Sequence, residues 1–157
     1  MLNILNSYCI IVDNISFIER KTKMKKFELG VLGTYSKTIT ETDIYNFAGI
    51  SGDFNQAHVD EEYAKNTHFK HRIAHGMLSG AMVTGALYKT GLGNGAIYVF
   101  QNCKFTAPVY IGDTVTVTID ITKIDEEKNR VFFDSNITNQ DGVMVLKGDG
   151  CVMPPRE

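Results

Sequence analysis

The segment from Gly76 to Tyr88 contains thirteen residues and no charged side chain. Its length and composition predict a helix that is apolar on nearly every side, and such a helix has to be buried on nearly every side. Gly76, Gly80 and Gly85 interrupt it, although each glycine costs a helix interior roughly 1 kcal/mol relative to alanine. We therefore expect another part of the structure, either a sheet or a ligand, to approach this helix backbone closely.

After this segment the sequence changes to a two-residue repeat. Four apolar residues of the stretch 114–124 alternate with polar ones: Val115, Val117, Ile119 and Ile121. This pattern is typical of an antiparallel strand with one buried face. Further strands are predicted over 27–39, 96–106, 131–138 and 143–152.

The order of these elements restricts the fold class. A single long apolar helix next to several long strands finds its largest apolar cover on the concave side of a twisted sheet. We therefore predict an α+β hot-dog fold, in which an antiparallel sheet wraps around one long buried helix. A generic α+β sandwich with its helices on one face is the alternative.

Two shorter helices are predicted before the long one. Thr40 resembles a helix N-cap with acidic residues in the first turn, and this helix should run to about Ser51, where Gly52 ends it. Asp60 can cap a second short helix. The polar residues between these helices are therefore expected on loops.

Composition limits the classes of function. A chain of 157 residues suits one domain, and 16 basic against 18 acidic residues give no electrostatic reason to expect nucleic acid or membrane partners. Cys9, Cys103 and Cys151 are odd in number and lack metal-ligand spacing, which argues against a disulfide framework or a zinc knuckle. A reducing, cytoplasmic location fits best.

Residues 1–23 differ from the rest of the chain. Polar residues interrupt their apolar run too often for a membrane span, and neither a basic region nor a cleavage site indicates a signal peptide. We predict a dispensable extension over 1–23, followed by a single domain over 24–157. An edge strand through residues 8–12 is the alternative.

Asp53 and His58 are the candidate acid–base pair, and His75, Gly76 and Met77 open the long helix. A carboxylate and an imidazole near free helix N–H groups supply proton transfer and an anion site. Either residue alone would more often be structural, but together the catalytic interpretation is favoured. His75 receives no chemical role, because it can simply satisfy backbone groups. No residue cluster has metal-ligand spacing, so we predict no metal and no separate cofactor.

The run from Phe47 to Asp60, together with Ile73 to Leu78, resembles the hydratase motif of the MaoC-like (R)-specific enoyl-CoA hydratases. The resemblance extends from about Met24 to the C-terminus. It implies a hot-dog fold, a homodimer or larger homo-oligomer, and hydration of trans-2-enoyl-CoA to (R)-3-hydroxyacyl-CoA. Coenzyme A is then part of the substrate and not a cofactor.

The resemblance also implies roles for individual residues. Asp53 and His58 would hold and activate one water, with the order of acid and base left open, and the backbone N–H of Gly76 would donate to the thioester oxygen. Asn55 would support the pair from its turn, and Thr84 aligns with a helix serine of some members. The sequence departs from the family at two positions. Gln56 stands where proline is usual, and the lack of proline suggests a looser turn. Thr84 stands in place of the serine.

Two other functions are alternatives. The first is an acyl-CoA thioesterase with the same fold, but many of those enzymes carry an acidic residue on the central helix, as acyl-carrier-protein dehydratases do. The segment from Gly76 to Tyr88 has none. The second is a non-catalytic acyl-CoA binding module, which would need no Asp/His pair.

Overall fold

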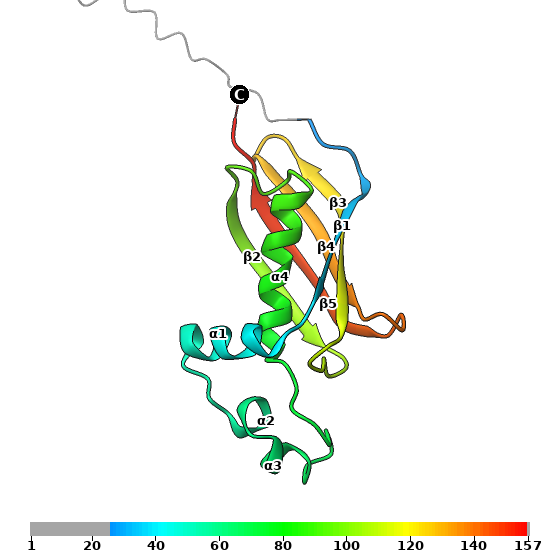
Figure 1. Cartoon of the computed structure of the whole chain (residues 1–157). Coiled ribbons are helices and arrows are strands. Elements are labelled where there is room, and N and C mark those ends of the chain that lie inside the picture. The colour runs from blue at the N-terminus through cyan, green and yellow to red at the C-terminus, as the bar shows by residue number, and fades with distance from the viewer. Residues whose placement is uncertain (1–25, 157) are drawn as a thin grey trace, which may run out of the picture.

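The computed structural model describes residues 26–156 and contains one antiparallel sheet (Figure 1). Its five strands lie in the order β1-β3-β4-β5-β2, so β1 and β2 form the two edges. The strands are β1 (Gly30–Thr38), β2 (Ile97–Phe105), β3 (Thr114–Asp125), β4 (Arg130–Thr138) and β5 (Met144–Met153). All five predicted strands are confirmed, although the first begins three residues later than expected.

The long helix α4 (Gly76–Lys89) lies across the concave side of this sheet, as Figure 1 shows. The inward side chains of the alternating strand β3 are at most 1% exposed, because they pack beneath the helix together with those of β4 and β5. The core contains Val83 and Leu87 of α4 and, on the strands, Val115, Val117, Ile119, Phe133, Ile137 and Leu146. The predicted hot-dog fold is therefore confirmed.

Side chains of the two edge strands contact the glycines of α4. A Cβ atom added at Gly76 would lie 3.2 Å from the ring of Phe105 on β2, and one added at Gly85 would lie 3.3 Å from the ring of Tyr35 on β1. Such contacts are close, so glycine allows the helix to approach both edges of the sheet. The expected close approach is confirmed, and it is made by the sheet.

One face of α4 remains open, so the prediction of a helix buried on nearly every side is wrong. Met77 and Tyr88 are 57% and 66% exposed, and Ala81 and Thr84 are exposed as well. The physical reason is that a single five-stranded sheet curves around only part of the helix circumference. The apolar composition of the open face still requires a cover.

Three short helices lie at the end of the sheet where α4 begins (Figure 1). The first, α1 (Glu41–Ser51), starts at a capping box between Thr40 and Asp43 and ends at Gly52, whose φ of 77° is left-handed. The third, α3 (Glu61–Ala64), is capped by Asp60. Both predicted helices are confirmed.

The second helix, α2 (Gln56–Val59), was not predicted, and it carries His58. The expectation that all site candidates lie on loops is therefore wrong for this residue. A one-turn helix is too short to produce a periodic pattern, and a side-chain cap at Asn55 starts it.

The N-terminal extension predicted over residues 1–23 lies outside the described residues. The part of the predicted domain that is described forms one sheet and one continuous core. Within residues 26–156, no helix is long and apolar enough to cross a membrane.

Candidate active site

Two side-chain hydrogen bonds shape the turn between α1 and α2. The backbone N–H of Asn55 donates to Oδ1 of Asp53 at 3.2 Å, and the N–H of Ala57 donates to Oδ1 of Asn55 at 3.0 Å. Aspartate and asparagine favour such turns because their short side chains reach the backbone two residues ahead. The turn exposes the Asp53 carboxylate and begins the helix that presents His58.

The hydrogen bond of His58 determines which of its ring nitrogens is free. Nδ1 lies 2.8 Å from the carbonyl oxygen of Ile73. A carbonyl can only accept, so Nδ1 carries the proton and donates it. In its neutral form the half-buried ring therefore presents Nε2 with an unshared electron pair, which can accept a hydrogen bond from a water.

His75 lies beside this pair, although sequence reasoning gave it no chemical role. Its side chain is 2% exposed, and Nε2 donates to the carbonyl oxygen of Asp53 at 2.9 Å. Its ring stacks on that of His58, with centroids 3.8 Å apart and planes inclined by 30°. The expectation that His75 satisfies a backbone group is thus confirmed. The ring contact with His58 was not predicted, because the two residues lie far apart in the sequence.

Asp53, His58 and His75 form a close cluster. Each offers one ligand-type atom within 4.8 Å of the other two. These residue types also bind metals, but the two imidazoles already donate to backbone carbonyls. The absence of a metal stays a prediction.

Gly76 is the first residue of α4, and no side chain caps this helix. Its backbone N–H makes no hydrogen bond within the described part of the chain. The first N–H groups of a helix have no intrahelical acceptor and lie at the positive end of the helix dipole. This N–H can therefore donate to an oxygen that develops negative charge.

A cavity of about 290 Å³ lies beside His58 and Gly76. Its other walls are mainly apolar and include Phe69, Ile73, Phe105, Val109 and Val145. This cavity can take an apolar group whose polar end reaches the imidazole and the helix N–H.

A second cavity, of about 490 Å³, lies between α4 and β2, and Phe105 lines both cavities. Thr84 lines this second cavity, and its hydroxyl donates to the carbonyl of Ala81 at 2.6 Å. The structure therefore brings together Asp53, His58 and His75, and places Gly76 with His58. Within the described residues, Thr84 does not share that cavity.

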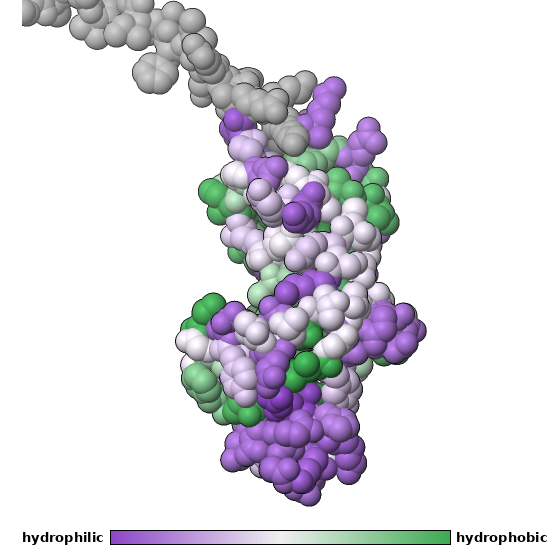
Figure 2. Space-filling view, in the orientation of Figure 1, coloured by the Kyte–Doolittle hydropathy of each residue, from purple (hydrophilic) through white to green (hydrophobic). Residues whose placement is uncertain are grey.

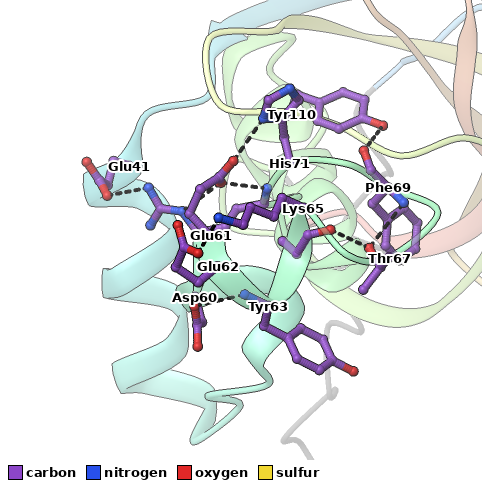
Figure 3. Close-up of polar contacts among 12 residues, drawn as sticks. Glu41, Asp60, Glu61, Glu62, Tyr63, Lys65, Thr67, Phe69, His71 and Tyr110 are labelled. Atoms are coloured by element: carbon purple, nitrogen blue, oxygen red, sulfur yellow. Dashed lines mark hydrogen bonds and ion pairs between the residues drawn. The ribbon is translucent and has the colours of Figure 1, made fainter.

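Polar contacts anchor the loop that carries the Ile73 carbonyl (Figure 3). The guanidinium of Arg72 lies 2.7 Å from Glu41 of α1, and the Arg72 backbone N–H donates to Glu61 of α3 at 3.1 Å. His71 donates to the other oxygen of Glu61 at 2.8 Å, which lowers the pKa of that carboxyl. The sequence pattern did not predict this cluster, because its charges lie far apart along the chain.

Gln56 occupies a position that suits proline. It is the first residue of α2, where proline is favoured. Asn55 has φ −55° and ψ 132°, which is the conformation that a following proline requires. The turn expected to be looser therefore keeps the shape that proline would impose.

The fold and the cluster define a hot-dog protein equipped for acid–base chemistry next to an apolar cavity. Residues 25–141 match the family model of the MaoC-like domain, and the chain belongs to this family.

Several hydratases are similar to this chain over most of their length. The (R)-specific enoyl-CoA hydratase of Rhodospirillum rubrum is 50% identical over 126 residues, which cover 80% of this chain and 87% of that protein. The enzyme of the same description from Aeromonas caviae is 33% identical, over 83% and 98% of the two chains. Among solved structures, the unliganded R-hydratase PhaJ1 from Pseudomonas aeruginosa has a TM-score of 0.80 and 39% identity, and 87% of each chain is covered.

The backbone at Gln56 leads to a stability test. We expect Gln56→Pro to raise the free energy of unfolding by about 0.4–1 kcal/mol, because proline restricts the unfolded chain at a position it already fits. The melting temperature should rise by about 1–4 °C in a thermal scan. The matched control is Ala57→Pro. It removes the backbone N–H that donates a hydrogen bond to Oδ1 of Asn55, and it should destabilise the protein. A lower melting temperature for Gln56→Pro would contradict this account of the turn.

Proposed function

We propose that this protein hydrates trans-2-enoyl-CoA to (R)-3-hydroxyacyl-CoA, and catalyses the reverse dehydration. The observation that carries the proposal is the hydrogen bond from His58 to the Ile73 carbonyl. It leaves Nε2 free to accept a hydrogen bond, and one nitrogen of the His58 ring lies within 4.8 Å of an Asp53 carboxylate oxygen. The similarity to (R)-specific hydratases supports the choice of substrate and product.

The proposed mechanism uses one water held between Asp53 and His58. One O–H of the water donates to Nε2 of His58, which polarises it, and the other donates to the Asp53 carboxylate. Asp53 takes this second proton and returns it to the α-carbon, while the water oxygen bonds to the β-carbon. Both new bonds then form on the same face of the double bond, and Asp53 ends as a carboxylate.

The N–H of Gly76 has a separate role in this scheme. As the oxygen attacks the β-carbon, negative charge moves to the thioester oxygen. A fixed N–H donor at a helix start stabilises that charge without having to reorient. The Gly76 N–H lacks an acceptor among the described residues, so it is available for this bond.

The two alternative functions lack a supporting observation. Helix α4 carries no acidic residue, in contrast to many thioesterases of this fold. A purely binding module would not need an imidazole with a free lone pair next to a carboxylate.

The cysteine thiols of Cys103 and Cys151 are free, and this supports the proposed cytoplasmic location.

The catalytic pair is tested by two variants. Asp53→Asn and His58→Ala should each lower the turnover of crotonyl-CoA by about 100- to 10,000-fold, since the first removes the proton carrier and the second removes the group that polarises the water. The assay follows loss of the conjugated thioester absorbance, and chiral analysis of the product checks the (R) configuration. Release of free thiol would instead identify a thioesterase. Near-normal hydration by either variant, with native circular dichroism, would remove that residue from the mechanism.

Gly76 is tested through its backbone. Gly76→Pro deletes the N–H, and we expect a loss of about 100- to 1,000-fold in turnover. The backbone can accept proline here, because His75 has φ −58° and ψ 135°. Gly76→Ala keeps the N–H but places a methyl group against Phe105, so its loss should be smaller.

The control for these substitutions is Gly49→Ala in α1, where an added Cβ meets no atom within 4 Å. It should preserve turnover. Binding of free coenzyme A, which lacks the acyl carbonyl, should change much less than turnover in both Gly76 variants. Equal losses of binding and turnover would show that Gly76 only maintains the packing of α4.

We also propose that the protein is a homodimer assembled through β2. This edge strand exposes four successive apolar side chains, Ile97, Tyr98, Val99 and Phe100. Figure 2 shows hydrophobic residues on the side of the molecule where β2 and α1 lie and also on the opposite side, whereas the region around α3 is mainly hydrophilic. An exposed apolar edge favours pairing with another strand, and a second copy would also cover the open face of α4.

The dimer is tested by comparing the two edges of the sheet. Ile97→Lys on β2 should convert a dimer to a monomer in sedimentation at micromolar concentration, because it places a charge within the apolar edge. Val31→Lys on β1 is the control, because Val31 is also exposed but lies on the opposite edge. A native protein that is monomeric and active would overturn the dimer. Dissociation by Val31→Lys alone would move the interface to β1.

A further inference from the structure

The side chain of His75 contacts both halves of the catalytic pair. Its Nε2 atom holds the Asp53 carbonyl at 2.9 Å, and its ring stacks on His58 at 3.8 Å. The ring of Phe47 on α1 also lies close to it, with a centroid separation of 5.0 Å. His75 is thus packed between two aromatic rings and immediately precedes Gly76.

Burial of the His75 imidazole lowers the stability of the fold, because one of its ring nitrogens lacks a hydrogen-bond partner among the described residues. Because Nε2 donates to a carbonyl, the other nitrogen, Nδ1, carries an unshared pair. This Nδ1 is buried and has no hydrogen-bond partner among the described residues. An unpaired buried acceptor lowers stability, and a phenylalanine would fill the same space without that cost.

The chain separates the three residues that His75 brings together. Asp53 follows α1, His58 lies on α2, and His75 occupies the position immediately before α4. The hydrogen bond to the Asp53 carbonyl fixes the backbone that carries the carboxylate. The stacking restrains the plane of the His58 ring in addition to the bond to Ile73.

We propose that His75 is a positioning residue that sets the separation and orientation of Asp53 and His58. This inference rests on the proposed hydration mechanism. Its donor nitrogen acts on Asp53 and its ring face acts on His58, so the two contributions can be separated by substitution. His75 itself does not transfer a proton to the substrate.

Two substitutions at His75 separate these contributions. His75→Phe keeps a ring for stacking but loses the donor, and we expect kcat for crotonyl-CoA to fall about 100-fold, because a misplacement of about 1 Å has an effect of that size. KM should stay within about threefold. His75→Gln can place an amide N–H near the position of Nε2, and its kcat should recover to within about tenfold of the native value.

The melting temperature distinguishes positioning from a structural role. His75→Phe removes the buried unpaired acceptor, so its melting temperature should stay within about 4 °C of the native value while kcat falls. Glu127→Gln is the control, because Glu127 is an exposed residue of the connection between β3 and β4, and it should leave kcat unchanged. A His75→Phe enzyme with native kcat, or a His75→Gln enzyme no better than His75→Phe, would overturn the proposal.

A measurement without substrate tests the same contact. A long-range ¹H–¹⁵N spectrum of the native protein should show His75 protonated at Nε2 and His58 protonated at Nδ1. The opposite form of His75 would overturn the bond to Asp53, whatever the activity. A native protein that fails to hydrate crotonyl-CoA but shows these two forms would refute the proposed function while leaving the hydrogen-bond arrangement supported.

Discussion

The contact of α4 with both edges of the sheet is the constraint on which the rest of the structure depends. Phe105 on one edge lies against Gly76, and Tyr35 on the other lies against Gly85. The helix is therefore held near each of its ends by an aromatic ring, and an added Cβ at either glycine would press against that ring. Because Gly76 is also the first residue of the helix, the same contact places the free N–H beside the apolar cavity.

The site is built mainly on backbone acceptors. His58 bonds to the carbonyl of Ile73, and His75 bonds to the carbonyl of Asp53. Each imidazole thus connects two segments of the chain, and each bond determines which nitrogen is left with a lone pair. A backbone carbonyl is present whatever side chain occupies its residue, so the protonation pattern of the site depends on how the segments are folded together more than on the neighbouring residue types.

The sequence predicted those features that produce a local or periodic signal. The alternation of Val115, Val117, Ile119 and Ile121 predicted β3, and Thr40 and Gly52 marked the ends of α1. The helix α2 was not predicted because it has only four residues, too few for a periodic pattern, and it begins at a single side-chain hydrogen bond to Asn55. Composition also could not show which side of α4 the sheet leaves open. The stacking of His75 on His58 was not predicted either, because seventeen positions separate the two residues.

The pairing of β2 has a consequence for the order in which the chain folds. Within the described sheet, β2 pairs only with β5, which is the last strand in the sequence. During synthesis, β2 emerges before β3, β4 and β5 and must wait for all three. Phe105, which lines the cavity beside Gly76, lies on β2. The wall of the catalytic cavity therefore forms only after nearly the whole chain has been made, and long-range pairing of this kind is slow.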